Sequence, residues 1–214
     1  MPFNDLDPQR TGLILFDFLN AYFRGANEES QRRMEPVVAN CVRLRAAADQ
    51  MAIPVFYPKA DHRLDGRDAA LLYSDTDMRL EPWPDPERDR FDARHTVAAN
   101  WSGEIIDELA PADGDYVIPK HRWSSFYQTK LELSMKVRGI DTMVLCGSAI
   151  GSGIAATVYS AQDRDFDIVV VRDACNPNEG PVHDVFMDGV FARIGRVRTA
   201  DQIVAMMQAG AAGG

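Results

Sequence analysis

The chain has 214 residues, of which 46% are hydrophobic and 26% are charged, and its net charge at pH 7 is −9. This size and composition fit one globular domain, so we expect a single domain over residues 1–214 with its core in about 10–207. The negative charge repels phosphate backbones and anionic lipid surfaces, which argues against nucleic-acid and membrane partners.

Short apolar runs alternate along the chain with segments of helical periodicity. In chain order we predict a strand at 12–17, a helix at 29–50, a strand at 53–57, a long loop with one or two short helices at 61–100, a helix at 101–109, a strand at 116–119, a helix at 125–137, a strand at 142–147, a helix at 152–163, a strand at 167–172, a helix at 180–191, a strand near 193–197, and a last helix capped by Thr199 and reaching Met207.

Strands that alternate with helices need crossover connections, which produce a parallel sheet with helices on both faces. We therefore predict an α/β fold with three αβα layers and a six-stranded parallel sheet of Rossmann-like topology. We predict a long loop at 61–100. Loops of this length in a compact domain more often have a function than not.

From the cysteines and the N-terminal residues we expect a cytoplasmic protein. Cys41, Cys146 and Cys175 are too few and too scattered for a disulfide framework, so we expect reduced thiols in the core. Residues 1–10 are polar and acidic, unlike a signal peptide, and no apolar run is long enough to span a membrane. The small residues at 209–214 predict a flexible tail.

Polar residues follow the predicted strands at the edge of the sheet where ligands bind in such folds. They are Asp17 and Asn20 after the first strand, Lys59, His62 and Arg63 after the second, Lys120 and Arg122 after the third, and the turn 148–153 after the fourth. Taken alone, Asp17 could simply cap a turn and Lys120 could be a solvated lysine. A carboxylate and several cations converging on one crevice favour a functional site.

Four segments in this order resemble the isochorismatase-like hydrolase superfamily. They are GLILFDFLNAYF (12–23), FYPKADHRLDGRD (56–68), ELAPADGDYVIPKHRWSSF (108–126) and VLCGSAIGSGIAATVYSAQDRDFDIVVVRDAC (144–175). The resemblance covers nearly the whole chain, and it is specific for the superfamily but not for a substrate. It also implies a homodimer or a homotetramer.

Most members of that superfamily are cysteine hydrolases with an Asp–Lys–Cys triad. The resemblance places the acid/base aspartate at Asp17, the lysine at Lys120 and the cysteine position at Gly153. The turn before that position usually contains a cis peptide, which is expected at Ala149–Ile150 and aims backbone N–H groups into the site. Ser152 is one position away from the nucleophile, so we interpret it as a helix cap or an oxyanion donor.

Glycine at position 153 closes the covalent route of a cysteine hydrolase. True isochorismatases resemble this chain in having glycine there, and they hydrolyse a vinyl ether with release of pyruvate. That reaction needs a general acid rather than a nucleophile, and Asp17 would be the acid if its pKa is raised. Lys120 would hold and orient the substrate, and the missing thiol would make room for a bulkier substrate.

Two other functions are compatible with the same residues. In the first, an amidohydrolase uses Asp17 to activate water and backbone amides near Gly153 to stabilise the oxyanion. In the second, a degenerate paralogue binds a ligand or completes an oligomer without catalysis. The sequence also leaves open the substrate, whether a neighbouring subunit completes the site, and whether Gly153 is native or an engineered replacement of cysteine.

The small-molecule substrate is expected to contact a set of residues around the catalytic pair. The set is Asn20, Lys59, His62, Arg63, Trp101, Arg122, Phe126, Ala149, Ile150 and Ser152. Within it, Lys59, His62 and Arg63 either clamp a substrate carboxylate or form a solvated loop. Trp101 and Phe126 either wall the pocket or serve packing.

No metal and no other cofactor are expected. Nicotinamidase-type relatives carry an Asp/His cluster on the loop after the second strand, and Asp61, His62 and Asp65 superficially suggest one here. A second histidine with the correct spacing is missing, and His95 lies far along the loop.

Overall fold

The computed structural model describes residues 5–24, 27–63, 68, 100–177 and 179–212. It confirms the predicted α/β fold: a six-stranded parallel sheet has the order β3-β2-β1-β4-β5-β6. The strands are β1 (Thr11–Phe16), β2 (Val55–Ala60), β3 (Tyr116–Lys120), β4 (Thr142–Ser148), β5 (Asp167–Asn176) and β6 (Arg196–Arg198).

Strands β1 and β4 form the centre of the sheet. Every residue of both strands is buried, and they pair in continuous register from Thr11↔Thr142 to Phe16↔Gly147. Covering on both faces explains why these strands are continuous apolar runs rather than alternating ones. The chain first builds outward from β1 to β3 and then returns to β4, so the direction of strand order switches between β1 and β4. Ligands bind at the carboxyl ends of strands at such a switch point.

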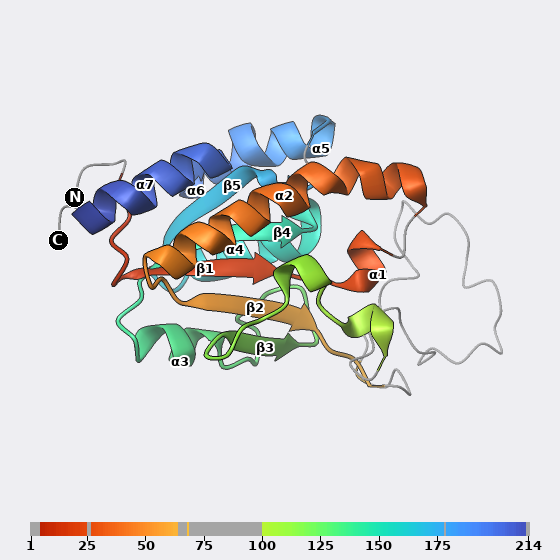
Figure 1. The fold of residues 1–214 in the computed structure, drawn as a ribbon, viewed down its shortest axis with the longest axis horizontal. Coiled ribbons are helices and arrows are strands. Elements are labelled where there is room, and N and C mark those ends of the chain that lie inside the picture. The colour runs from red at the N-terminus through yellow and green to blue at the C-terminus, as the bar shows by residue number, and fades with distance from the viewer. Residues whose placement is uncertain (1–4, 25–26, 64–67, 69–99, 178, 213–214) are drawn as a thin grey trace.

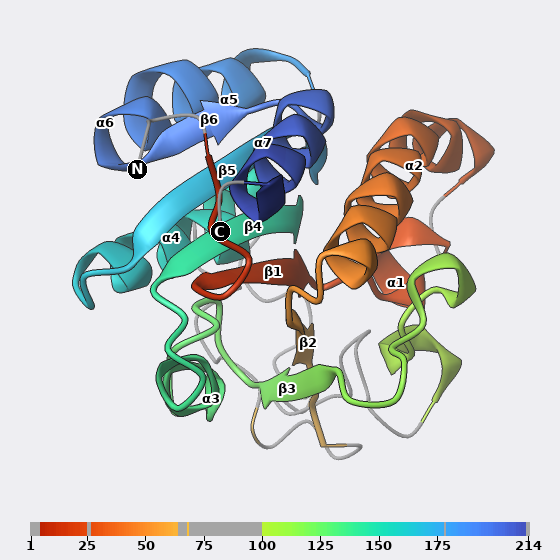
Figure 2. The same ribbon diagram turned by 60° about the vertical axis from the view of Figure 1, so that its left-hand side comes forward.

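Helices cover both faces of the sheet (Figures 1 and 2). The long helix α2 (Glu28–Gln50) packs with α7 (Ala200–Ala212) on one face, and the Asn27 side chain caps α2 by accepting the Ser30 N–H. On the other face lie α3 (Leu131–Lys136) and α4 (Ala155–Gln162). The remaining helical segments are α1 (Asn20–Phe23), α5 (Pro181–Asp184), α6 (Ala192–Ile194), 3₁₀ turns at Trp101–Gly103 and Asp107–Leu109, and π-helical turns at Ile150–Ile154 and Val185–Phe191.

Several predicted helices differ from the structure. The helix predicted at 125–137 is only Leu131–Lys136, because Gln128 has a left-handed backbone with φ of 53°, which a right-handed helix cannot contain. The predicted helix at 101–109 is two 3₁₀ turns, separated where Ile105 bridges to Leu19. The predicted helix at 180–191 is split between α5 and a π-helical turn.

The last helix is longer than predicted. It continues to Ala212, so most of the segment expected to be a flexible tail is helical. Of the predicted loop at 61–100, residues 64–67 and 69–99 lie outside the described residues, so the one or two short helices expected in this loop stay a prediction.

The three cysteines are free and buried in the core, as predicted. Burial raises the pKa of the Cys41 and Cys175 thiols, which keeps both in the unreactive thiol form. None of the described helices is both long and apolar enough to cross a membrane.

Candidate active site

Asp17 connects the carboxyl ends of three strands. It follows β1 directly and has a left-handed backbone with φ of 53°. Its Oδ1 accepts the Ala60 N–H from the end of β2 at 2.7 Å, and its Oδ2 accepts Lys120 Nζ from the end of β3 at 2.6 Å. Ala60 and Lys120 are register partners, so the pairing of β2 with β3 delivers both donors to one carboxylate.

The Asp17–Lys120 pair is almost completely removed from solvent. Asp17 is 5% exposed and Lys120 is 4% exposed. Burial raises the pKa of Asp17, because a carboxylate loses its hydration there; Lys120, the Ala60 N–H and His62 oppose that rise. Asp17 therefore keeps its proton to a higher pH than an ordinary aspartate, as a general acid must.

The turn after β4 contains a cis peptide, as expected, but at Ser148–Ala149 rather than at Ala149–Ile150. The expectation was wrong by one residue because β4 continues through Ser148, which pairs with Asn176 of β5. Ile150 is fully buried in the following π-helical turn. The Ser152 N–H, considered above as an oxyanion donor, donates to the Ala149 carbonyl within the turn.

Lys59 was expected beyond the second strand but lies within β2. Since side chains alternate along a strand, Lys59 belongs to the face of Tyr57, and Tyr57 contacts Arg45 of α2. Ala60 and its partner Lys120 belong to the opposite face. The sequence alone did not define the end of β2, so it did not separate Lys59 from the site.

Asn20, Trp101 and Phe126 were also predicted to contact the substrate, and the structure places them as follows. The Asn20 amide donates to the Trp101 carbonyl at 3.0 Å, so it fixes the 3₁₀ turn at Trp101–Gly103. Trp101 itself is 54% exposed. Phe126 is buried and packs against Phe166, with ring centroids 5.4 Å apart, so the structure supports its packing interpretation.

Asp68 joins the loop after β2 to the loop after β3. Its carboxylate oxygens lie 3.4 Å from His62 Nδ1 and 3.5 Å from His121 Nδ1, and both oxygens accept the Arg63 N–H. Arg122 donates to the Asp68 carbonyl at 2.7 Å. The sequence analysis missed Asp68 and His121, although His121 directly follows Lys120 at a strand end.

The ligand atoms of His62, Asp68 and His121 all lie within 4.8 Å of one another, so these three could hold a divalent cation. The second histidine that the sequence lacked on the loop after β2 thus comes from the loop after β3. Burial lowers the pKa of His62, which leaves the imidazole neutral, the form that binds metals. The Arg122 guanidinium beside Asp68 disfavours a second cation there.

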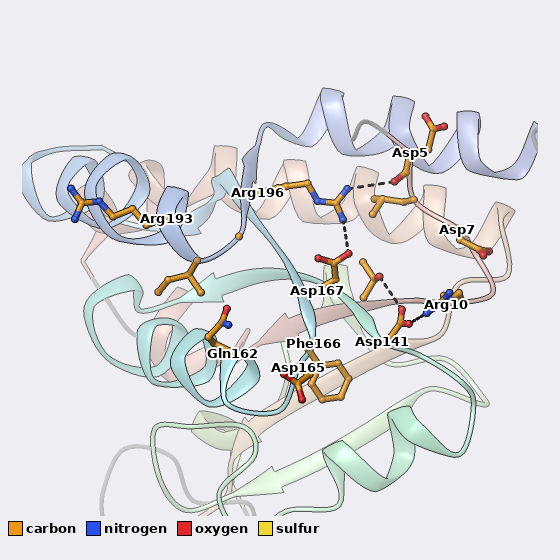
Figure 3. A pocket seen from close by; sticks show the side chains of 14 residues that line it. Asp5, Asp7, Arg10, Asp141, Gln162, Asp165, Phe166, Asp167, Arg193 and Arg196 are labelled. Carbon is orange, nitrogen blue, oxygen red and sulfur yellow. Dashed lines mark hydrogen bonds and ion pairs between the residues drawn. The ribbon is translucent and has the colours of Figure 1, made fainter. Parts of the chain in front are cut away.

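A surface hollow of about 840 Å³ lies at the opposite edge of the sheet, around the amino ends of β4 and β5 (Figure 3). Charged side chains line it, and several of them are paired: Arg10 with Asp141, and Arg196 with Asp167 at 3.7 Å. Asp17 and Lys120 do not line this hollow. Its volume therefore gives no reason to move the candidate site away from the buried pair.

The combination of a strand-end aspartate, a strand-end lysine and the turn after β4 agrees with a comparison against known families. The isochorismatase domain matches residues 11–202. The chain belongs to the isochorismatase family. Membership of this family leaves the substrate and the bond it would cleave open.

Individual relatives differ in how much they share with this isochorismatase-family chain. It is 33% identical over 108 residues to the uncharacterised isochorismatase family protein YwoC of Bacillus subtilis. The aligned region covers 50% of this chain and 57% of YwoC. It is 28% identical over 200 residues to N-carbamoylsarcosine amidase of Arthrobacter, which covers 94% of this chain and 72% of the amidase. The match to YwoC thus spans little more than half the length of that relative.

A solved structure supports the fold. A cysteine hydrolase from Pseudomonas syringae pv. phaseolicola has a TM-score of 0.76 over 96% of this chain and 95% of its own, at 20% sequence identity. At this level of identity the likeness concerns the fold alone.

Proposed function

We propose that this family member hydrolyses a vinyl ether in a small carboxylated substrate, without a thiol nucleophile. The observation that carries the proposal is the buried Asp17 carboxyl with its raised pKa, in a chain that has glycine at position 153. Asp17 is the general acid and Lys120 its electrostatic partner.

The proton balance of this reaction is simple. Asp17 transfers its proton to the terminal carbon of the enol ether, which leaves an oxocarbenium ion on the substrate. Water adds to that cation and returns a proton to the Asp17 carboxylate. The resulting hemiketal collapses to pyruvate and an alcohol, so one water is consumed and the carboxyl is regenerated. The Ala60 N–H and Lys120 hold the carboxylate in place while its charge changes.

The test measures pyruvate with a coupled lactate dehydrogenase assay after addition of isochorismate. We expect turnover, and we expect Asp17→Asn to lower it by a factor of roughly 10²–10⁴, the range typical of general acid catalysis. The matched control is Asp141→Asn at the far edge of the sheet, which should keep turnover within about twofold. Absence of pyruvate at high enzyme concentration would contradict the proposal.

The extended match to N-carbamoylsarcosine amidase favours a second candidate, hydrolysis of a C–N bond. In that reaction Asp17 activates water, and ammonia rather than pyruvate is released from amides. Because this route uses no thiol, iodoacetamide should leave turnover unchanged. If neither product forms but a ligand raises the melting temperature, the chain is a binding protein that has lost catalysis.

A further inference from the structure

The aromatic ring of Phe16 fills the space that a side chain at position 153 would occupy. A Cβ placed on Gly153 would lie 2.4 Å from Cζ and 2.5 Å from Cε1 of Phe16. Unbonded carbons in proteins approach to roughly 3.5–4.0 Å, so no side chain fits while the ring is there. The expectation that the missing thiol leaves room for a bulkier substrate is therefore wrong: Phe16 is fully buried and takes that room.

The backbone of Phe16 is also confined. Gly147 in β4 has φ of 132°, and a Cβ there would lie 2.0 Å from the Phe16 carbonyl oxygen. Only glycine combines that conformation with so close an approach. The Phe16 main chain thus packs against Gly147, and the Phe16 ring packs against Gly153.

The other partner of the ring is Lys120. Its Nζ lies 4.4 Å from the centre of the Phe16 ring, within the range of a cation–π contact. The same Nζ donates to Asp17 at 2.6 Å. The Lys120 ammonium is therefore held between a carboxylate and an aromatic ring, and the ring meets Gly153 at the position where the superfamily resemblance puts a cysteine.

We propose that Phe16 and Gly153 form a coupled pair. The Phe16 ring occupies the space that the side chain of a nucleophile at position 153 would need, and it positions the Lys120 ammonium against Asp17. Phe16 is a positioning residue, since it acts on the carboxyl through Lys120. The pair also explains position 153: the glycine accommodates the ring. A cysteine introduced there alone meets the Phe16 ring, so a thiol site needs two changes. The positioning role rests on the proposed function, whereas the packing of the pair does not.

The packing is tested by a double-mutant cycle of Gly153→Ala and Phe16→Val, read as melting temperature. Overpacking by Gly153→Ala should lower the Tm by roughly 4–8 °C in the presence of Phe16, and by less than about 2 °C in the Phe16→Val background. The matched control is Gly151→Ala in the same turn, whose Cβ would meet its nearest atom, on Phe186, at an ordinary 3.5 Å. Equal losses in both backgrounds, or a Gly153→Ala effect as small as that of Gly151→Ala, would overturn the proposal.

A second measurement does not depend on Gly153→Ala being folded. Iodoacetamide labelling of the folded protein, followed by intact mass, compares Gly153→Cys with Phe16→Val/Gly153→Cys. The introduced thiol should react at least about tenfold faster in the double variant, because it then has space beside the Lys120 ammonium. The native cysteines are buried and provide a low background. Equal labelling rates in the two variants would count against the pair.

The positioning role is read from the pH profile of kcat/KM for whichever substrate is turned over. Phe16→Leu frees the ammonium, so the pKa of Asp17 rises and the alkaline limb, which reports loss of its proton, moves to higher pH while kcat falls. The matched control is Phe56→Leu, which replaces a buried aromatic residue on the neighbouring strand β2 and should leave the alkaline limb in place. If the alkaline limb of the pH profile does not move in Phe16→Leu, Phe16 has no positioning role. If the native protein turns over no substrate, the proposed function fails, and the packing and labelling results still decide the pair.

Discussion

The two edges of the sheet carry similar ion pairs in very different surroundings. At the carboxyl edge, Asp17 and Lys120 are 5% and 4% exposed. At the amino edge, the side chains of Arg10 and Asp141 are 62% and 42% exposed and border an open hollow. Burial raises the pKa of Asp17 in the buried pair, because its carboxylate has lost its hydration. Desolvation, and not the volume of a depression, is what distinguishes the edge with the candidate site.

The two edges differ in how much hydration their charged groups have lost. Charges at the amino edge remain in water, where salt and solvent screen their attraction and little is gained or lost by breaking it. Charges at the carboxyl edge have given up most of their hydration, so each depends on its partner. Predictions about the two edges therefore diverge, and each one can be tested with matched substitutions.

The largest expected difference is in stability after loss of the cation. Lys120→Met leaves a buried carboxylate without its ammonium, and we expect a loss of about 3–5 kcal/mol in the free energy of unfolding at alkaline pH. The loss should shrink at acid pH, where Asp17 takes up a proton. Arg10→Met breaks the exposed pair and should cost at most about 1 kcal/mol. Urea denaturation of both variants measures this, and equal costs would remove the distinction between the edges.

The second prediction concerns the pH dependence of stability. Because the pKa of Asp17 is raised above 3.8 by folding, the folded state binds its proton more tightly than the unfolded state. The stabilisation is complete below pH 3.8 and is lost as the pH rises through the pKa in the folded state. Relative to Asp17→Asn, the native protein should therefore lose stability toward neutral pH, by about 1.4 kcal/mol for each unit of raised pKa.

The measurement is a series of urea denaturations of both proteins between about pH 4 and pH 8. Asp141→Asn serves as the comparison at the amino edge, and no systematic trend of this sign is expected for it. A native protein that instead gains stability relative to Asp17→Asn as the pH rises would mean that Lys120 outweighs burial and that Asp17 is an ionised carboxylate in the folded state.

The sequence was sufficient for the fold because its signals are periodic. Apolar runs separated by helical segments define a parallel sheet, and parallel strands must present their carboxyl ends at one edge. This geometry is why Asp17 and Lys120, 103 residues apart, could be placed together before their contact was known. The ends of the strands were harder to predict. Whether Lys59 lies in β2 and which peptide bond is cis depend on where β2 and β4 end, and the sequence pattern does not define a strand end to within one residue.

Contacts between side chains of distant segments could not be predicted at all. Nothing in the residue types of Phe16 and Gly153 says that a ring of β1 fills the space beside the turn after β4. The meeting of His62, Asp68 and His121 likewise depends on how two loops approach each other. Sequence reasoning therefore placed Asp17 and Lys120 together and misjudged the space around them.

The smallest expected effect is that of metal ions. His62, Asp68 and His121 form a further group of titratable side chains among the described residues of the carboxyl edge, and their donors suit zinc or manganese. Yet the Asp68 carboxylate already accepts the Arg63 N–H, and the Arg122 guanidinium donates to the Asp68 main-chain carbonyl, so an added cation meets an occupied ligand and a like charge on the same residue. We expect EDTA, Zn²⁺ and Mn²⁺ to change the Tm by less than about 1 °C. A rise in Tm with either ion that disappears in His121→Ala would show that the two loops bind metal and that the carboxyl edge contains a second site.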